Sequence, residues 1–174
     1  SSFQLETIKT FHPTIAIVLN VTPNHMDRYE RFNDYAAAKH RIFMNQTVDN
    51  VAVLNADDET VSSWASGLRA KVMYFSVRQD LGDRGVFLKG NELVFRDQVV
   101  LRVNELKLRG LHNVENVAAA FAAGIAAGAS LESMAATAKQ FNPVEHRLEF
   151  VAEIDGVRFY NDSKATSVDA TLKA

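Results

Sequence analysis

Residues 14–19 read TIAIVL, an unbroken apolar run rich in β-branched side chains. A short run of this kind is typical of a strand buried on both faces of a parallel sheet. Two similar runs follow at 51–54 (VAVL) and 72–75 (VMYF), with segments that favour helices between them. Because strands that alternate with helices form parallel sheets, the sequence predicts an α/β fold: a mostly parallel sheet flanked by helices.

The expected helices span residues 34 to about 46, 58 to about 67, 113–127 and 130 to about 141. Asn33, Asp57 and Ser130 stand where N-terminal caps belong. Gly128 stands where a C-terminal glycine cap belongs, and apolar side chains recur at helical spacing through the segment before it. The helix over 113–127 is therefore the clearest of the four.

Residues 85–103 have a different pattern. Short strand-like runs alternate there with the turn pairs Gly90-Asn91 and Arg96-Asp97, which predicts a small accessory antiparallel sheet beside the main one. A further hairpin is expected from runs at 148–154 and 157–160, joined across residues 155–156.

Composition excludes several classes of protein. The net charge of −2 among 174 residues offers no strongly basic field for nucleic acid or an anionic membrane. The chain has no cysteine, which excludes disulfides, thiolate metal sites and thiol catalysis and suits a cytoplasmic protein. No apolar run is long enough to cross a membrane, so no membrane insertion is expected.

Polar residues gather after the first strand and in the helix beyond it. Residues 20–28 read NVTPNHMDR, where His25 and Asp27 can bind a metal or place a phosphate, or can belong to a capped surface loop. Lys39 stands beside three alanines that leave room around it, although most helical lysines are simply solvated. These residues alone do not decide between the readings.

Three later segments are also more polar than an ordinary loop requires. Residues 110–116 (GLHNVEN) open the clearest helix, whose free N–H groups attract anions, although Asn113 can equally be an N-cap. Residues 145–149 (EHRLE) contain an arginine suited to a base or a phosphate, or to a surface salt bridge. Residues 161–166 (NDSKAT) can meet a ribose and phosphates, or form a polar turn. Taken alone, these residues predict an α/β domain with polar loops at its strand ends, for which nucleotide binding is one of the readings left open.

Taken in order, these segments resemble the Mur ligase family. The resemblance lies in SSFQL at 1–5, NVTPNHMDR at 20–28, AAAK at 36–39, GLHNVEN at 110–116, EHR at 145–147 and NDSKAT at 161–166. The DSKAT form at 162–166 resembles the branch that adds D-glutamate. Because these motifs occur in the right order across nearly the whole chain, the resemblance is specific.

The resemblance implies an ATP-dependent amide ligase of peptidoglycan precursor synthesis. ATP would phosphorylate the carboxylate of UDP-N-acetylmuramoyl-L-alanine, and the amine of D-glutamate would then attack the acyl phosphate. Mg²⁺, with Mn²⁺ as an alternative, and protein donors would neutralise the charges that meet in that step. The protein is expected to be a monomer and to act in the cytoplasm.

The same resemblance implies roles for particular residues. His25 would be a metal ligand, and Lys39 would be carbamylated by CO₂ and so become an anionic oxygen ligand suited to Mg²⁺. Asn113 and Asn116 would bind the adenine, Arg147 the nucleotide and Asp162 the ribose. Lys164 and Thr166 would contact phosphate or the muramoyl group. Ser1 would contact the substrate. Asn24 replaces the family's usual acidic residue before the histidine, and Ser167 replaces a common asparagine.

The resemblance also implies a domain organisation. Residues 1–160 would form the central ATP-binding domain, and 161–174 would begin the connection to a C-terminal domain. The UDP-binding domain, the phosphate loop and a glutamate metal ligand would precede the chain. We therefore expect the 174 residues alone to be inactive. The alternatives are a ligase for another amino acid, a folylpolyglutamate-type ligase, and a non-catalytic nucleotide-binding module.

Overall fold

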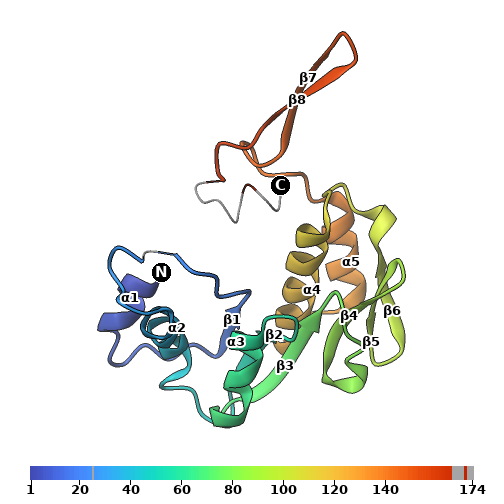
Figure 1. Cartoon of the computed structure of the whole chain (residues 1–174). Helices are drawn as coiled ribbons and strands as arrows, with labels where there is room; N and C mark the ends of the chain where they lie inside the picture. Colours follow the sequence, from blue (N-terminus) through green and yellow to red (C-terminus); the bar gives the residue numbers. More distant parts are fainter. Residues whose placement is uncertain (25, 166–170, 172–174) are drawn as a thin grey trace.

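A central sheet, in which the strands follow their order in the chain, organises the fold (Figure 1). The computed structural model describes residues 1–24, 26–165 and 171. Within them, one sheet contains β1 (Ile15–Val18), β2 (Val51–Asn55), β3 (Lys71–Ser76), β4 (Gly85–Lys89), β5 (Glu92–Phe95) and β6 (Gln98–Arg102). Pairing is parallel from β1 to β4 and antiparallel from β4 to β6. The predicted α/β class is confirmed.

The helices are α1 (Ser2–Thr7), α2 (Phe32–His40), α3 (Glu59–Ser63), α4 (Leu111–Ala126) and α5 (Leu131–Gln140), with 3₁₀ turns η1 (Arg41–Phe43), η2 (Trp64–Gly67), η3 (Gly82–Arg84) and η4 (Val103–Glu105). As predicted, Ser130 caps α5 by accepting a hydrogen bond from the Ser133 N–H. Gly128, with φ +80°, follows α4 in a Schellman motif: its N–H bonds to Ile125, and the next N–H bonds to Gly124.

Three predicted helix starts are wrong. Arg31 rather than Asn33 precedes α2, and its carbonyl accepts from the N–H groups of residues 34 and 35. Asp58 rather than Asp57 caps α3, through the Val61 N–H. Gly110, with φ +87°, precedes α4, so Asn113 lies inside the first turn and is not its cap. The helix expected to reach residue 46 ends at 40 and continues as a 3₁₀ turn.

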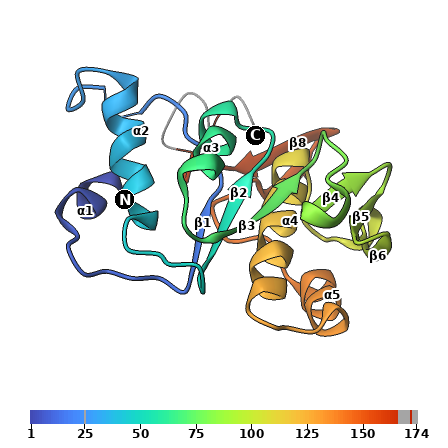
Figure 2. The same cartoon turned by 90° about the horizontal axis from the view of Figure 1, so that it is seen from below.

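Alternate side chains of the sheet pack into two separate cores. Val53 of β2 and Phe75 of β3 are fully buried in the core that includes α4. Ala52 and Leu54, which point the other way, pack with α2 and α3. Figure 2 shows the same division, with α4 and α5 on one side of the sheet and α3 on the other. The helices thus hold the carboxyl ends of the parallel strands in fixed relative positions.

β1 departs from the burial that its sequence predicts. Ile17 is 38% exposed, and Leu19, just after the strand, is 40% exposed. The reason is topological, because β1 is the first strand of the sheet and has one neighbouring strand, β2, in the described part of the chain. The expectation that this run is buried on both faces is therefore wrong for these two residues.

The antiparallel strands over residues 85–103 extend the main sheet and do not lie beside it. β4 pairs in parallel with β3, bringing Gly85 opposite Tyr74. A Cβ atom on Gly85 would lie 1.9 Å from the Tyr74 carbonyl oxygen, so the close approach requires glycine. The small separate sheet is instead the predicted hairpin, β7 (Glu149–Ile154) and β8 (Val157–Asn161), which projects from the rest of the molecule in Figure 1.

Candidate functional site

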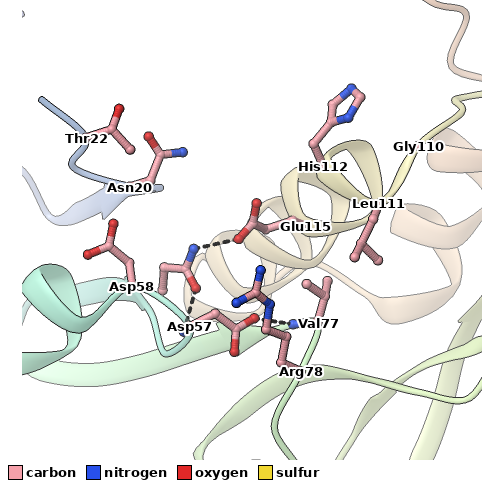
Figure 3. Close-up of a pocket in the computed structure, with 11 residues that line it drawn as sticks. Asn20, Thr22, Asp57, Asp58, Val77, Arg78, Gly110, Leu111, His112 and Glu115 are labelled. Carbon is pink, nitrogen blue, oxygen red and sulfur yellow. Dashed lines mark hydrogen bonds between the residues drawn. The ribbon is translucent and has the colours of Figure 1, made fainter. Parts of the chain in front are cut away.

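A cavity of about 330 Å³ opens where β1, β2 and β3 end beside the start of α4 (Figure 3). It is lined by Asn20, Thr22, Asn55, Asp57, Asp58, Val77, Arg78, Gly110, Leu111, His112 and Glu115. Ligands of open α/β sheets bind outside the carboxyl ends of the strands, and this cavity lies at that position. The structure therefore brings together two segments that the sequence singled out, the loop after β1 and the start of α4.

Asn55 links three elements at the floor of this cavity. Its amide nitrogen donates to the Leu19 carbonyl and to Glu115 Oε1, both at 2.7 Å, and its oxygen accepts from the Asp57 N–H at 2.8 Å. The residue is only 2% exposed. Asn55 belongs to none of the polar segments singled out from the sequence, although a polar residue at the end of β2 obeys the same strand-end rule as the loop after β1.

Asp57 and Asp58 use their carboxylates to order the neighbouring turns. Asp57 accepts from Ser76 Oγ at 2.6 Å and from the Val77 N–H at 2.7 Å. Besides capping α3, Asp58 accepts from the Val21 N–H at 2.8 Å. Among the described residues, no group of three or more His, Asp or Glu side chains is arranged to hold a metal ion.

A second cluster joins α1 to the loop that follows β1. Arg28 donates to Glu6 at 2.7 Å, and the Tyr29 hydroxyl donates to the other oxygen of the same carboxylate. The Arg28 guanidinium also lies 4.7 Å from the centre of the Phe3 ring. The hydrogen bond from Tyr29, followed by that from Arg28, holds the pKa of Glu6 below its usual value. The cluster thus ties the loop to the helix that Ser1 precedes as N-cap.

Replacing Glu6 with glutamine is expected to destabilise the protein at neutral pH but not in acid. A carboxyl whose pKa is lowered by folding stabilises the folded state above its unfolded pKa of roughly 4.3, and this contribution is lost as the pH falls through the folded value. The stability of wild-type and E6Q protein in urea should therefore differ at pH 7, and the difference should shrink as the pH falls below roughly 4.3 and through the lowered pKa of Glu6. The control E30Q removes an exposed carboxylate from the loop before α2 and should follow wild type throughout; a constant gap for E6Q would contradict the assignment.

Lys39 lies on α2 near this cluster. Its Nζ is 4.9 Å from the centre of the Tyr35 ring, and that ring packs edge-on against Tyr29 with centroids 5.3 Å apart. The aromatic face favours a cation at this position. His25 lies outside the described residues, so the geometry of a joint site with Lys39 is not defined. The described side chains alone do not make a site for Mg²⁺.

The two C-terminal motifs lie side by side. The ring Nδ1 of His146 and the amide nitrogen of Asn161 are 2.8 Å apart, and the Lys164 N–H donates to the His146 carbonyl at 3.1 Å. Asp162 Oδ1 accepts from the Leu148 N–H at 3.1 Å. Arg147 lies in the first of these motifs and Lys164 in the second, and both are exposed. The structure therefore joins these predicted nucleotide-binding segments, while Thr166 lies outside the described residues.

Asn113 and Asn116 lie apart from the cavity of Figure 3. Asn113 donates to the Arg109 carbonyl at 2.6 Å. Asn116 is exposed at the edge of a mainly apolar cavity of about 520 Å³ between α4 and α5. They share one side of α4, whereas Glu115 faces the strand-end cavity. Their predicted role at the adenine stays a prediction.

Comparison with known proteins agrees with this fold. Residues 1–124 match the Mur ligase middle domain family. Relatives from Solibacter usitatus and Koribacter versatilis are 51% and 48% identical, and both are named UDP-N-acetylmuramoylalanine--D-glutamate ligase. Each match covers 100% of this chain but only 39% of the relative's length.

Solved structures give the same architecture. A crystal structure of MurF from Acinetobacter baumannii has a TM-score of 0.78 at 23% identity, over 92% of this chain and 36% of that one. A MurC structure from Thermotoga maritima has a TM-score of 0.72 at 21% identity, over 99% of this chain and 38% of that one. These likenesses bear on the fold alone. Because the middle-domain match spans residues 1–124, well over half of the sequence, the chain belongs to the Mur ligase family.

Proposed function

We propose that the protein containing this chain joins D-glutamate to UDP-N-acetylmuramoyl-L-alanine at the expense of ATP, in peptidoglycan precursor synthesis. The observation that carries the proposal is the identity of 48–51%, over the whole chain, to relatives named as this ligase. The DSKAT sequence at 162–166, which resembles the D-glutamate-adding branch, supports the same choice.

The proposed reaction is balanced over two steps. The substrate carboxylate attacks the γ-phosphorus of ATP, which forms an acyl phosphate and releases ADP. The D-glutamate amine then attacks the acyl carbon, loses a proton and expels inorganic phosphate. Both steps bring anionic groups together, so positioned cations and N–H donors are needed. On this chain the exposed cations Arg147 and Lys164, ordered beside Asp162, suit that task.

Residue roles follow as parts of the proposal. Asn113 and Asn116 contact adenine, Arg147 the nucleotide, Asp162 the ribose, Lys164 and Thr166 phosphate or the muramoyl group, and Ser1 the substrate. His25 and carbamylated Lys39 hold Mg²⁺, which would supply charge neutralisation at the phosphates.

The proposal extends to the organisation of the protein. Residues 1–160 belong to its central ATP-binding domain, and 161–174 begin the connection to the next. The 174 residues alone lack ligase activity, since they correspond to 39% of the length of the relatives named as this ligase. We also propose that the protein is a monomer, and that it acts in the cytoplasm because ATP and the nucleotide-linked precursor are cytoplasmic substrates. No helix in the described ranges is long and apolar enough to cross a membrane.

The test is an assay of full-length protein with ATP, Mg²⁺ and UDP-N-acetylmuramoyl-L-alanine. We expect phosphate release coupled to amide formation with D-glutamate, and little with L-glutamate, L-alanine or D-lysine. Preference for another amino acid would indicate a different ligase. Titration with ATP and Mg²⁺ in a calorimeter tests the remaining alternative, a non-catalytic module. Binding of ATP without turnover on any acceptor would indicate such a module.

A further inference from the structure

We infer that Asn55 and Glu115 form a positioning pair that orients α4 for nucleotide binding. The inference rests on the proposed function, because that function places the adenine beside Asn113 and Asn116 of the same helix. Asn55 lies outside the motifs by which the sequence resembles its family, and Glu115 lies within the segment 110–116 at a position to which the resemblance assigns no role. They are assigned from their contacts, and neither is proposed to touch the nucleotide.

Asn55 is held too firmly to be an adaptable surface residue. Both of its donors and its acceptor are engaged, with the Leu19 carbonyl, Glu115 Oε1 and the Asp57 N–H as partners. At 2% exposure, it has little access to water that could replace a lost partner. The side chain therefore fixes three points at once: the end of β1, the turn after β2 and the second turn of α4.

Glu115 is the residue of α4 to which the Asn55 side chain is hydrogen-bonded. A hydrogen bond from an amide to a carboxylate is charge-assisted, and at 2.7 Å it is short. The start of α4 has no side-chain cap, because Gly110 occupies the N-cap position. Since successive helical residues are about 100° apart, fixing Glu115 also fixes the directions of Asn113 and Asn116. A helix released at this point can rotate or shift, and both asparagines would move with it.

The bond also couples two halves of the proposed site. Asn55 holds the Leu19 carbonyl, immediately before the loop of residues 20–28 that contains His25. Through one buried side chain, the start of that loop and the start of α4 are therefore kept in register. Loss of the pair should weaken ATP binding more than it slows the chemical step at saturating ATP.

The experiment measures steady-state kinetics and calorimetric ATP affinity in full-length protein bearing N55A, E115A, E115Q or both alanines. We expect N55A and E115A to raise the KM and Kd for ATP about tenfold, the order expected for losing a hydrogen bond to a charged group, with a smaller change in kcat. E115Q keeps an oxygen that accepts the same bond and should stay within about twofold of wild type. The double variant should be no worse than N55A, because N55A already removes the bond to Glu115 that E115A removes.

E132A, which removes an exposed carboxylate from α5, is the matched control and should leave ATP affinity unchanged. Thermal unfolding identifies variants that are merely unstable, and the comparison of E115A with E115Q remains informative if N55A does not fold. Folded N55A and E115A that bind ATP like wild type would overturn the inference, as would E115Q that is as impaired as E115A. Wild type that binds ATP but forms no amide refutes the proposed function alone, because the affinities still test the pair.

Discussion

Arginine in place of Lys39 is expected to lower the ligase rate about 10²–10³-fold, the range typical of losing one group that stabilises charge in a transition state. Arginine keeps the positive charge and can still lie over the Tyr35 ring, where Lys39 Nζ is now 4.9 Å from the centroid. It cannot form the proposed carbamate, because the guanidinium stays protonated. A rate loss as large in K39R as in K39A would therefore indicate that the modified amine is required.

A separate readout detects the modification itself. Wild-type protein equilibrated with ¹³C-bicarbonate should show a carbamate carbon signal, and K39R should not. K71R is the matched control, since Lys71 is an exposed lysine at the start of β3 and should keep full activity. A fully active K39R protein would refute the proposed role of Lys39, and a wild type without the labelled carbon would refute carbamylation.

Alanine in place of Gly85 is expected to destabilise the fold by about 3 kcal/mol, at the upper end for overpacking a core. The new Cβ would lie 1.9 Å from the carbonyl oxygen and 2.5 Å from the carbonyl carbon of Tyr74. Backbone atoms of a paired strand cannot rotate away as a side-chain tip can. β4 would have to separate from β3 and displace Val86 and Phe87, which are 0% and 2% exposed.

Urea unfolding measures this effect, and another glycine supplies the control. A Cβ on Gly67 would meet nothing within 4 Å, so G67A should be neutral or stabilise by up to about 1 kcal/mol through the unfolded state. The midpoint of G85A should fall well below those of wild type and G67A. Equal midpoints for the two variants would contradict the close approach of β3 and β4.

Local chemistry explains which parts of the fold the sequence predicted. Apolar runs located the strands, and Gly128 and Ser130 marked helix ends correctly, because these signals act within a few residues. The cap of α3 was misplaced by one position because Asp57 and Asp58 are adjacent and equally suited to it. Only the contacts of Asp57 with Ser76, the last residue of β3, and with Val77, just after it, assign it elsewhere.

The features that the sequence did not predict depend on contacts between residues far apart in the chain. The exposure of Ile17 depends on β1 having one neighbouring strand in the described part of the sheet, which no local pattern encodes. The parallel pairing of β4 with β3 is equally non-local. In the candidate site, the polar residues after β1 pointed to the edge formed by the carboxyl ends of the strands, where the structure has the cavity of Figure 3. Asn55 and Glu115, however, are 60 positions apart, so their contact had no signal in the sequence.

The entropic cost of bringing paired strands together decreases across the sheet from β1 to β5, because the order of the strands follows the chain. Pairing partners are 36 positions apart between β1 and β2 (Ile15 and Val51) but only 7 apart between β4 and β5 (Phe87 and Val94). Since the cost of closing a loop grows with the logarithm of its length, joining β1 costs about 1.5 kcal/mol more than joining β5. The β1 side of the sheet, from which the loop of residues 20–28 leaves, is thus the part whose closure depends most on packing by α2 and α3.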